Sequence, residues 1–201
     1  MVRHESAKLL SPGSNPGGAS KEKVIFITFS FFAFFYHHLH TLSWVIKMWK
    51  KVKPYVISII IALLVGGLSA ILTKDNMEVY STINRPPLAP PASIFPIVWG
   101  ILFILMGISS AIIYKSHSKD SKNSLTIYAI QLLVNFFWSL IFFNLRNYLF
   151  AFIWILFLWL LIIYMIFEFY KTNKIAAYLQ IPYLLWVTFA TYLTFMIWIL
   201  N

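Results

Sequence analysis

Residues 95–114 read FPIVWGILFILMGISSAIIY, an uninterrupted apolar stretch of twenty residues without a charged side chain. A helix of this length spans the hydrocarbon core of a lipid bilayer, which is about 30 Å thick. Further long apolar stretches occur at residues 55–72, 125–143, 149–167 and 176–199. All are continuously apolar, whereas the strands of a membrane barrel alternate between polar and apolar residues. The sequence therefore predicts an all-α membrane protein, a bundle of five transmembrane helices.

The overall composition agrees with a bilayer environment. Of 201 residues, 60% are hydrophobic and 11% are charged, against about 25% charged residues in soluble domains. The net charge is +10, but the basic residues stand between the apolar stretches, and no nucleic-acid-binding motif occurs, so nucleic acid is not expected as a partner. Cysteine is absent, which excludes disulfides, thiolate metal sites and a cysteine nucleophile.

Lysine and arginine are distributed unequally between the two ends of the predicted helices. One end has nine of them and the other has three: Lys47, Lys50, Lys51, Lys53, Lys115, Lys119, Lys122, Lys171 and Lys174 against Lys74, Arg85 and Arg146. Short cytoplasmic loops carry the excess of basic residues in membrane proteins. We therefore expect the side that precedes the first helix to be cytoplasmic and the carboxyl terminus to lie outside.

Residues 1–47 do not fit this plan. Residues 11–18 (SPGSNPGG) are typical of a disordered linker, and the apolar run at residues 24–36 is short for a membrane span. We expect residues 1–47 to be an extension that is disordered or partly membrane-associated, and residues 48–201 to form the five-helix domain. Two alternatives stay open: a signal peptide, although no clear cleavage site follows the apolar run, and translation that begins at Met48.

The apolar stretches contain no Asp, Glu, Lys, Arg or His. Glu168 lies just beyond the end of the stretch at residues 149–167. Ion-coupled transporters normally need ionisable residues within the membrane, and hydrolytic triads and paired carboxylates are missing as well. His117 lies in a predicted loop, and His37, His38 and His40 would lie on different faces of a helix. We therefore expect neither a bound metal nor a cofactor, and bis-histidine haem ligation is unsupported.

Aromatic and amide side chains recur at helical spacing on three of the predicted helices. The three faces are Phe95, Trp99, Phe103 and Met106; Gln131, Asn135, Trp138 and Phe142; and Tyr183, Trp186, Ala190 and Thr194. An amide in lipid needs a partner, so these faces are expected to point into the bundle. They could enclose a flat, mostly apolar ligand. The alternative is that the aromatic rings serve helix packing alone.

Small residues also follow helical spacing, in Ala62, Gly66 and Ala70 and again in Gly107 and Ala111. Faces of this kind allow helices to approach closely in lipid. We expect them to contribute to a homodimer. Packing within one protomer would explain the same pattern equally well.

Three segments resemble the TspO/MBR family of tryptophan-rich sensory and translocator proteins in their order and spacing. They are the proline-rich loop with the helix that follows it at residues 84–107, the third helix at residues 131–143 and the fifth helix at residues 181–193. The resemblance covers residues 54–201. Val79 and Leu88 depart from it, because many members have tryptophan at these loop positions.

The resemblance implies a five-helix bundle of a bacterial plasma membrane, often dimeric, that binds a porphyrin or haem-like ligand beneath the first loop. The matching ligand-binding positions are Tyr80, Pro91, Trp99, Asn135, Trp138, Phe142, Trp186 and Ala190. Light-dependent porphyrin breakdown is ascribed to pocket tryptophans in some bacterial members, so the resemblance makes Trp99 and Trp186 the candidate catalytic residues. The alternative function is a non-catalytic carrier or interaction scaffold for porphyrin or another apolar ligand.

Overall fold

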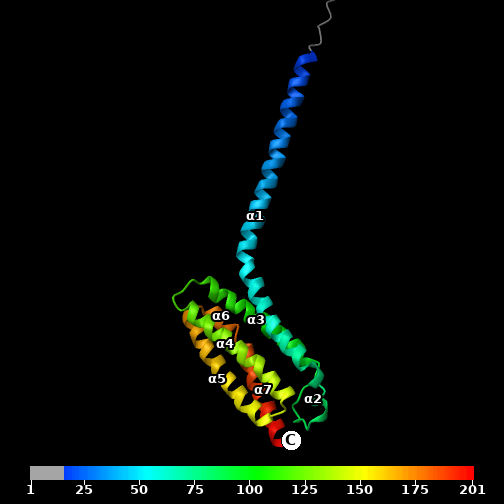
Figure 1. Ribbon diagram of the computed structural model, residues 1–201. Coiled ribbons are helices and arrows are strands. Elements are labelled where there is room, and N and C mark those ends of the chain that lie inside the picture. The colour runs from blue at the N-terminus through cyan, green and yellow to red at the C-terminus, as the bar shows by residue number, and fades with distance from the viewer. Residues whose placement is uncertain (1–15) are drawn as a thin grey trace, which may run out of the picture. The chain divides into compact units, whose positions relative to one another are not determined.

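The computed structural model describes residues 16–201 of the chain. Figure 1 shows the elements, which in order are α1 (Pro16–Thr73), η1 (Lys74–Asn76), α2 (Val79–Thr82), α3 (Ile94–Lys115), α4 (Ser121–Ser139), η2 (Leu140–Asn144), α5 (Tyr148–Thr172), α6 (Lys174–Tyr178) and α7 (Ile181–Leu200). Within the described residues there is no strand. The prediction of an all-α fold is confirmed.

The helical stretches that are long and apolar enough to cross a membrane lie at Thr28–Asn76, Ile94–Lys115, Ser121–Asn144, Tyr148–Thr172 and Lys174–Leu200. The five predicted stretches all fall within them. The prediction of five membrane-spanning helices is therefore confirmed, and the protein is an integral membrane protein.

The chain divides into two compact units, residues 1–50 and residues 51–201. The described part of the first unit belongs to α1, and several of its large apolar side chains, among them Phe29, Phe35 and Trp44, are exposed. The sequence predicts that residues 1–47 are disordered or partly membrane-associated. Residues 16–47 are helical in the structure, residues 1–15 lie outside the described part of the chain, and membrane association stays a prediction.

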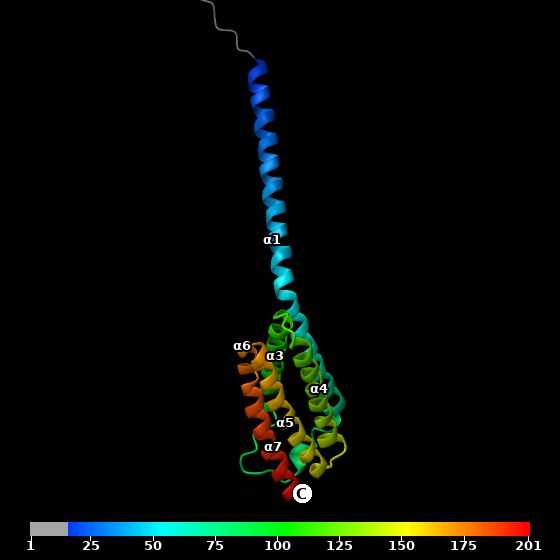
Figure 2. The same ribbon diagram turned by 90° about the vertical axis from the view of Figure 1, so that its left-hand side faces the viewer.

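Helix α5 lies at the centre of the second unit and packs against α4, α6 and α7 (Figure 2). Its buried apolar side chains are spaced three and four residues apart, as expected for one face of a helix. These side chains, each at most 1% exposed, are Ala151, Ile155, Leu158, Ile162, Met165 and Phe169. The outward side chains of α5, such as Phe157 and Phe167, are apolar too and are exposed, which suits contact with lipid.

Helices α1 and α3 approach each other closely at glycine. A Cβ atom at Gly66 would overlap with the ring of Phe103, and one at Gly107 would lie 2.5 Å from the Cα atom of Ile59. Ala62, one turn before Gly66, is fully buried. The structure thus places these small residues in packing within one protomer. The homodimer stays a prediction, but these positions no longer support it.

Helix α4 ends in the π-helical turn η2, which widens the helix by one residue per turn. The Asn144 side chain donates a hydrogen bond to the Leu72 carbonyl oxygen at 3.0 Å and accepts one from the Asn76 amide at 3.1 Å. These bonds tie the end of α4 to the end of α1. Asn144 directly follows Phe142 and Phe143, which belong to the cavity described next.

Candidate ligand-binding cavity

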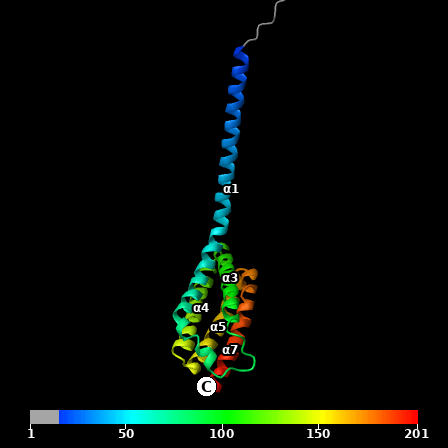
Figure 3. The same cartoon turned by 90° about the vertical axis from the view of Figure 1, so that its right-hand side faces the viewer.

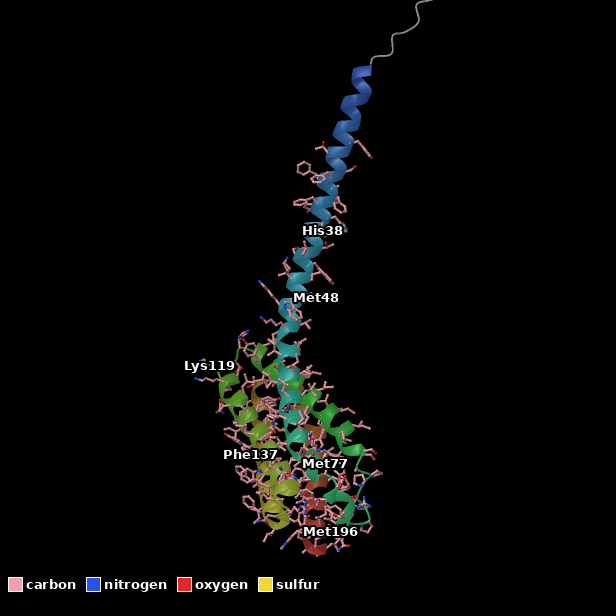
Figure 4. The ribbon with its side chains drawn as sticks, turned by 45° about the vertical axis from the view of Figure 1, so that its right-hand side comes forward. His38, Met48, Met77, Lys119, Phe137 and Met196 are labelled. Carbon is pink, nitrogen blue, oxygen red and sulfur yellow. The ribbon has the colours of Figure 1, made fainter. Side chains whose placement is uncertain are left out.

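A cavity of about 180 Å³ lies among α1, α3, α4 with η2, α7 and the segment that connects α1 to α3. Figure 3 shows how these helices are arranged. Its lining is uncharged throughout. The lining residues are Val65, Gly66, Ser69, Ala70, Thr73, Met77, Tyr80, Ala92, Phe95, Pro96, Trp99, Phe103, Asn135, Phe136, Trp138, Ser139, Phe142, Phe143, Ala190, Leu193, Thr194 and Ile197. Figure 4 labels Met77, a lining residue that lies between η1 and α2 in the connecting segment.

Two pairs of stacked aromatic rings form much of the wall. On α3 the rings of Trp99 and Phe103 have their centroids 5.5 Å apart with an interplanar angle of 30°. On α4 and η2 the rings of Trp138 and Phe142 are 5.3 Å apart, also at 30°. Both pairs are four residues apart in sequence, so each stack follows directly from the helical repeat. The cavity therefore offers flat apolar surfaces from two different helices.

Tyr80 lines the cavity at the end formed by the connecting segment. Its hydroxyl donates a hydrogen bond to the Pro90 carbonyl oxygen at 3.1 Å, and its ring meets Phe95 edge-on at 5.3 Å. Burial raises the pKa of the Tyr80 hydroxyl above its usual value, while the nearby Arg85 guanidinium acts to lower it. Tyr80 thus joins the loop to the first turn of α3.

Several polar side chains of the lining have no hydrogen-bond partner among the described residues. Within the described part of the chain, the Ser69 hydroxyl and the Trp138 indole N–H are buried without a partner. Asn135 is 5% exposed, and its side-chain amide makes no hydrogen bond to the described residues. By contrast, Thr73 and Thr194 donate to carbonyl oxygens of their own helices. Since buried polar groups are usually paired, the first three are available to a ligand.

Gln131, on the same predicted face as Asn135, has a different role. It is fully buried, and its side-chain oxygen accepts a hydrogen bond from the Tyr183 hydroxyl at 2.9 Å. The Tyr183 ring in turn lies edge-on to Trp99 at 6.1 Å. Gln131 therefore joins α4 to α7 beneath the cavity and does not line it.

Of the eight predicted ligand-binding residues, six line the cavity: Tyr80, Trp99, Asn135, Trp138, Phe142 and Ala190. Pro91 is next to the lining residue Ala92 but is not part of the lining. Trp186 lies behind the wall, with its ring edge-on to Phe95 at 5.9 Å, and it lines a separate groove between α3 and α7. Ligand binding at these eight positions stays a prediction.

The wall formed by α1 was not predicted from the sequence. Ala62, Gly66, Ser69 and Thr73 are separated by four, three and four residues, which is also the spacing of the predicted face from Gln131 to Phe142. This repeat is the signal that could have identified the α1 wall. It is weak, because small and hydroxyl side chains on a membrane helix are more often read as packing positions.

Comparison with known proteins fits this arrangement of helices and cavity. The sequence profile of the TspO/MBR family matches residues 57–199. The chain belongs to the TspO/MBR family. It is 36% identical over 155 residues to the tryptophan-rich protein TspO of Chlorobaculum tepidum, which covers 76% of this chain and 98% of that relative.

Two further relatives show how widely members of the TspO/MBR family are distributed. The translocator protein of Ovis aries is 33% identical over 127 residues, which is 62% of this chain and 75% of the relative. The tryptophan-rich sensory protein of Cereibacter sphaeroides is 32% identical over 126 residues, or 63% of this chain and 77% of the relative. The cavity lies entirely within the segment that matches the family.

Proposed function

We propose that this TspO/MBR protein is a sensory protein that binds a tetrapyrrole, a porphyrin or haem-like molecule, in the cavity. The two ring stacks, Trp99 with Phe103 and Trp138 with Phe142, carry this proposal, because flat aromatic surfaces suit the faces of a macrocycle. The name of the Cereibacter sphaeroides relative, a tryptophan-rich sensory protein, supports the sensory role.

A tetrapyrrole needs more room than the cavity has in this structure. Pockets for small molecules usually hold roughly 300–1,000 Å³, against about 180 Å³ here. The extra space comes from α1 in this proposal. Among residues 51–73, all of them described, only Ala62, Ser69 and Thr73 are buried. A shift of this segment therefore exposes few buried side chains, although it separates Gly66 from Phe103 and Ile59 from Gly107.

A substitution that fills the cavity tests the proposal. Ala190 is 6% exposed on the α7 wall, so in Ala190→Phe the added ring occupies the space of the ligand. We expect titration of the purified protein with protoporphyrin IX to be saturable, and Ala190→Phe to weaken binding at least roughly tenfold, equivalent to about 1.4 kcal/mol.

The matched control is Ile199→Phe, on the same helix but 57% exposed and outside both the cavity and the groove of Trp186. It adds a ring on the surface and is expected to leave binding unchanged. Thermal unfolding shows whether both variants are folded. Equal binding by parent, Ala190→Phe and Ile199→Phe would place the ligand outside the cavity and contradict the proposal.

We also propose that the protein resides in a bacterial plasma membrane, as a homodimer, with the loop between α3 and α4 in the cytoplasm. The excess of lysine on that side supports this orientation. Residues 48–201 are proposed to be sufficient for binding, and titration of a chain that begins at Met48 tests this boundary.

Breakdown of the bound porphyrin in light is a second candidate function, which the position of Trp99 on the cavity wall favours.

A further inference from the structure

The cavity and its surroundings differ sharply in charge. The lining contains no Asp, Glu, Lys, Arg or His among the described residues. A carboxylate moved into such an environment loses its hydration and gains no counter-charge, which is unfavourable. A ligand with both an apolar body and carboxylates must therefore leave its carboxylates at the edge of the cavity.

Arg85 provides a positive charge at that edge. It lies on the exposed loop between α2 and α3, with its guanidinium carbon 5.4 Å from the centre of the Tyr80 ring. Tyr80 itself lines the cavity. Within the described residues the ion pair found is that of Lys171 with Glu168, so the Arg85 guanidinium has no carboxylate partner there.

The backbone on both sides of Arg85 is held in place. The Asn84 backbone N–H donates a hydrogen bond to the side-chain oxygen of Asn201 at 2.9 Å, and the Asn201 amide donates to the Asn84 carbonyl oxygen at 3.1 Å. On the other side, Pro86 is buried and its carbonyl oxygen accepts from the Ala89 N–H at 2.9 Å. Proline also restricts the backbone. The guanidinium is thus presented from a constrained segment.

We propose that Arg85 is a specificity-determining residue that binds a carboxylate of the ligand at the mouth of the cavity, while the apolar body of the ligand lies inside. The guanidinium can form two parallel hydrogen bonds with one carboxylate. A tetrapyrrole with carboxylate side chains along one edge of the ring fits this division. The inference rests on the proposed function and adds to it the orientation of the ligand.

The test compares protoporphyrin IX with its dimethyl ester, which has the same ring but no carboxylate. Both are titrated into the full-length protein in nanodiscs of phosphatidylcholine, which has no net charge. The parent is expected to bind the acid about tenfold more tightly than the ester, the effect of one charge-assisted contact. Arg85→Gln should lose this preference and bind the ester as the parent does.

Arg146→Gln is the matched control. Arg146 is an exposed arginine that follows η2, and it does not belong to the cavity lining. This variant should keep the full preference for the acid, and Arg85→Lys should keep part of it.

Four results would overturn the inference. Equal binding of acid and ester by the parent, or an unchanged preference in Arg85→Gln, would show that Arg85 does not bind the carboxylate, while the proposed function stands. Equal weakening of acid and ester in Arg85→Gln would show that Arg85 only supports Tyr80. If neither compound binds to the parent, the proposed function fails together with the inference.

Discussion

The tryptophans around the cavity differ in what their rings and indole N–H groups contact. Trp154 donates its indole N–H to the Val134 carbonyl oxygen at 2.8 Å, whereas the N–H groups of Trp138 and Trp186 are buried without a partner among the described residues. Trp99 and Trp138 line the cavity, but Trp186 does not. If an indole ring donates an electron to the photoexcited porphyrin, the transfer is fastest from a ring that contacts the porphyrin.

Photochemistry should therefore depend on Trp99 more than on Trp186. Trp99→Phe preserves an aromatic ring next to Phe103 but removes the easily oxidised indole. We expect it to abolish the light-dependent loss of porphyrin absorption while affinity changes only a few-fold. Trp186→Phe should have a smaller effect, because Phe95 separates Trp186 from the cavity.

The measurement is porphyrin absorption over time in light, with darkness as the control. The double variant combines Trp99→Phe with Trp186→Phe. If its loss of absorption in light is undiminished, neither tryptophan takes part in the reaction, and binding alone is the function. A larger effect of Trp186→Phe than of Trp99→Phe would contradict the cavity as the place where the reaction occurs.

Among the structural elements, the segment that connects α1 to α3 covers one end of the cavity. It carries Tyr80 and Ala92 into the lining, and the reciprocal contact of Asn84 with Asn201 attaches it to the end of α7. A loop held by a few hydrogen bonds at its edge can open locally while the helices stay folded. Its attachment should therefore set the rate of ligand exchange.

Asn201→Ala removes the side chain that both accepts from and donates to Asn84. Each lost hydrogen bond costs about 0.5–1.5 kcal/mol. We expect amide hydrogen exchange in residues 83–93 to become about tenfold faster, since 1.4 kcal/mol is a factor of ten. Association and dissociation of porphyrin should both become faster.

Thr126→Ala is the control for this experiment, because it removes an exposed hydroxyl that bonds within α4 to the Lys122 carbonyl oxygen. Amide hydrogen exchange in residues 83–93 should be the same in Thr126→Ala as in the parent. If Asn201→Ala leaves that exchange unchanged, the contact does not hold the loop.

The membrane-spanning elements could be predicted from the sequence because length and apolarity alone define them. The stretch at residues 149–167 was predicted to end earlier than α5, which continues to Thr172. Glu168 allows this extension: it is buried, and it pairs with Lys171 at 2.6 Å and accepts from Asn123 at 3.3 Å. Such partners lie on another helix or outside the apolar run, so the run itself does not reveal them.

The cavity could be predicted only in part. Helical periodicity shows which side chains share a direction around one helix, and this was enough for Asn135, Trp138 and Ala190. Periodicity does not show which residues of other helices lie between a side chain and the cavity. Trp186 shares a predicted face with Ala190, yet Phe95 of α3 lies between it and the cavity. That relation depends on the packing of two helices.

At the scale of the whole molecule, the distribution of lysine and arginine predicts how the second unit is oriented in the membrane. The chain has no cysteine, so single cysteines can report accessibility without background. Lys119, labelled in Figure 4, is exposed in the loop between α3 and α4, and Leu88 is 66% exposed in the loop between α2 and α3.

In intact cells a membrane-impermeant maleimide should label Leu88→Cys. Lys119→Cys should be labelled only after the membrane is permeabilised, because the basic side is expected to face the cytoplasm. The reverse pattern would show that the protein has the opposite orientation. Labelling of both positions in intact cells would show that the two loops are not separated by a membrane.

A crystal structure of the protein with protoporphyrin IX tests the central claim most directly. We predict electron density for the macrocycle between the Trp99–Phe103 and Trp138–Phe142 stacks, with α1 displaced to enlarge the cavity beyond its present volume of about 180 Å³. Density for the macrocycle only in the groove of Trp186 and Phe189 between α3 and α7, with the cavity unchanged, would contradict the account.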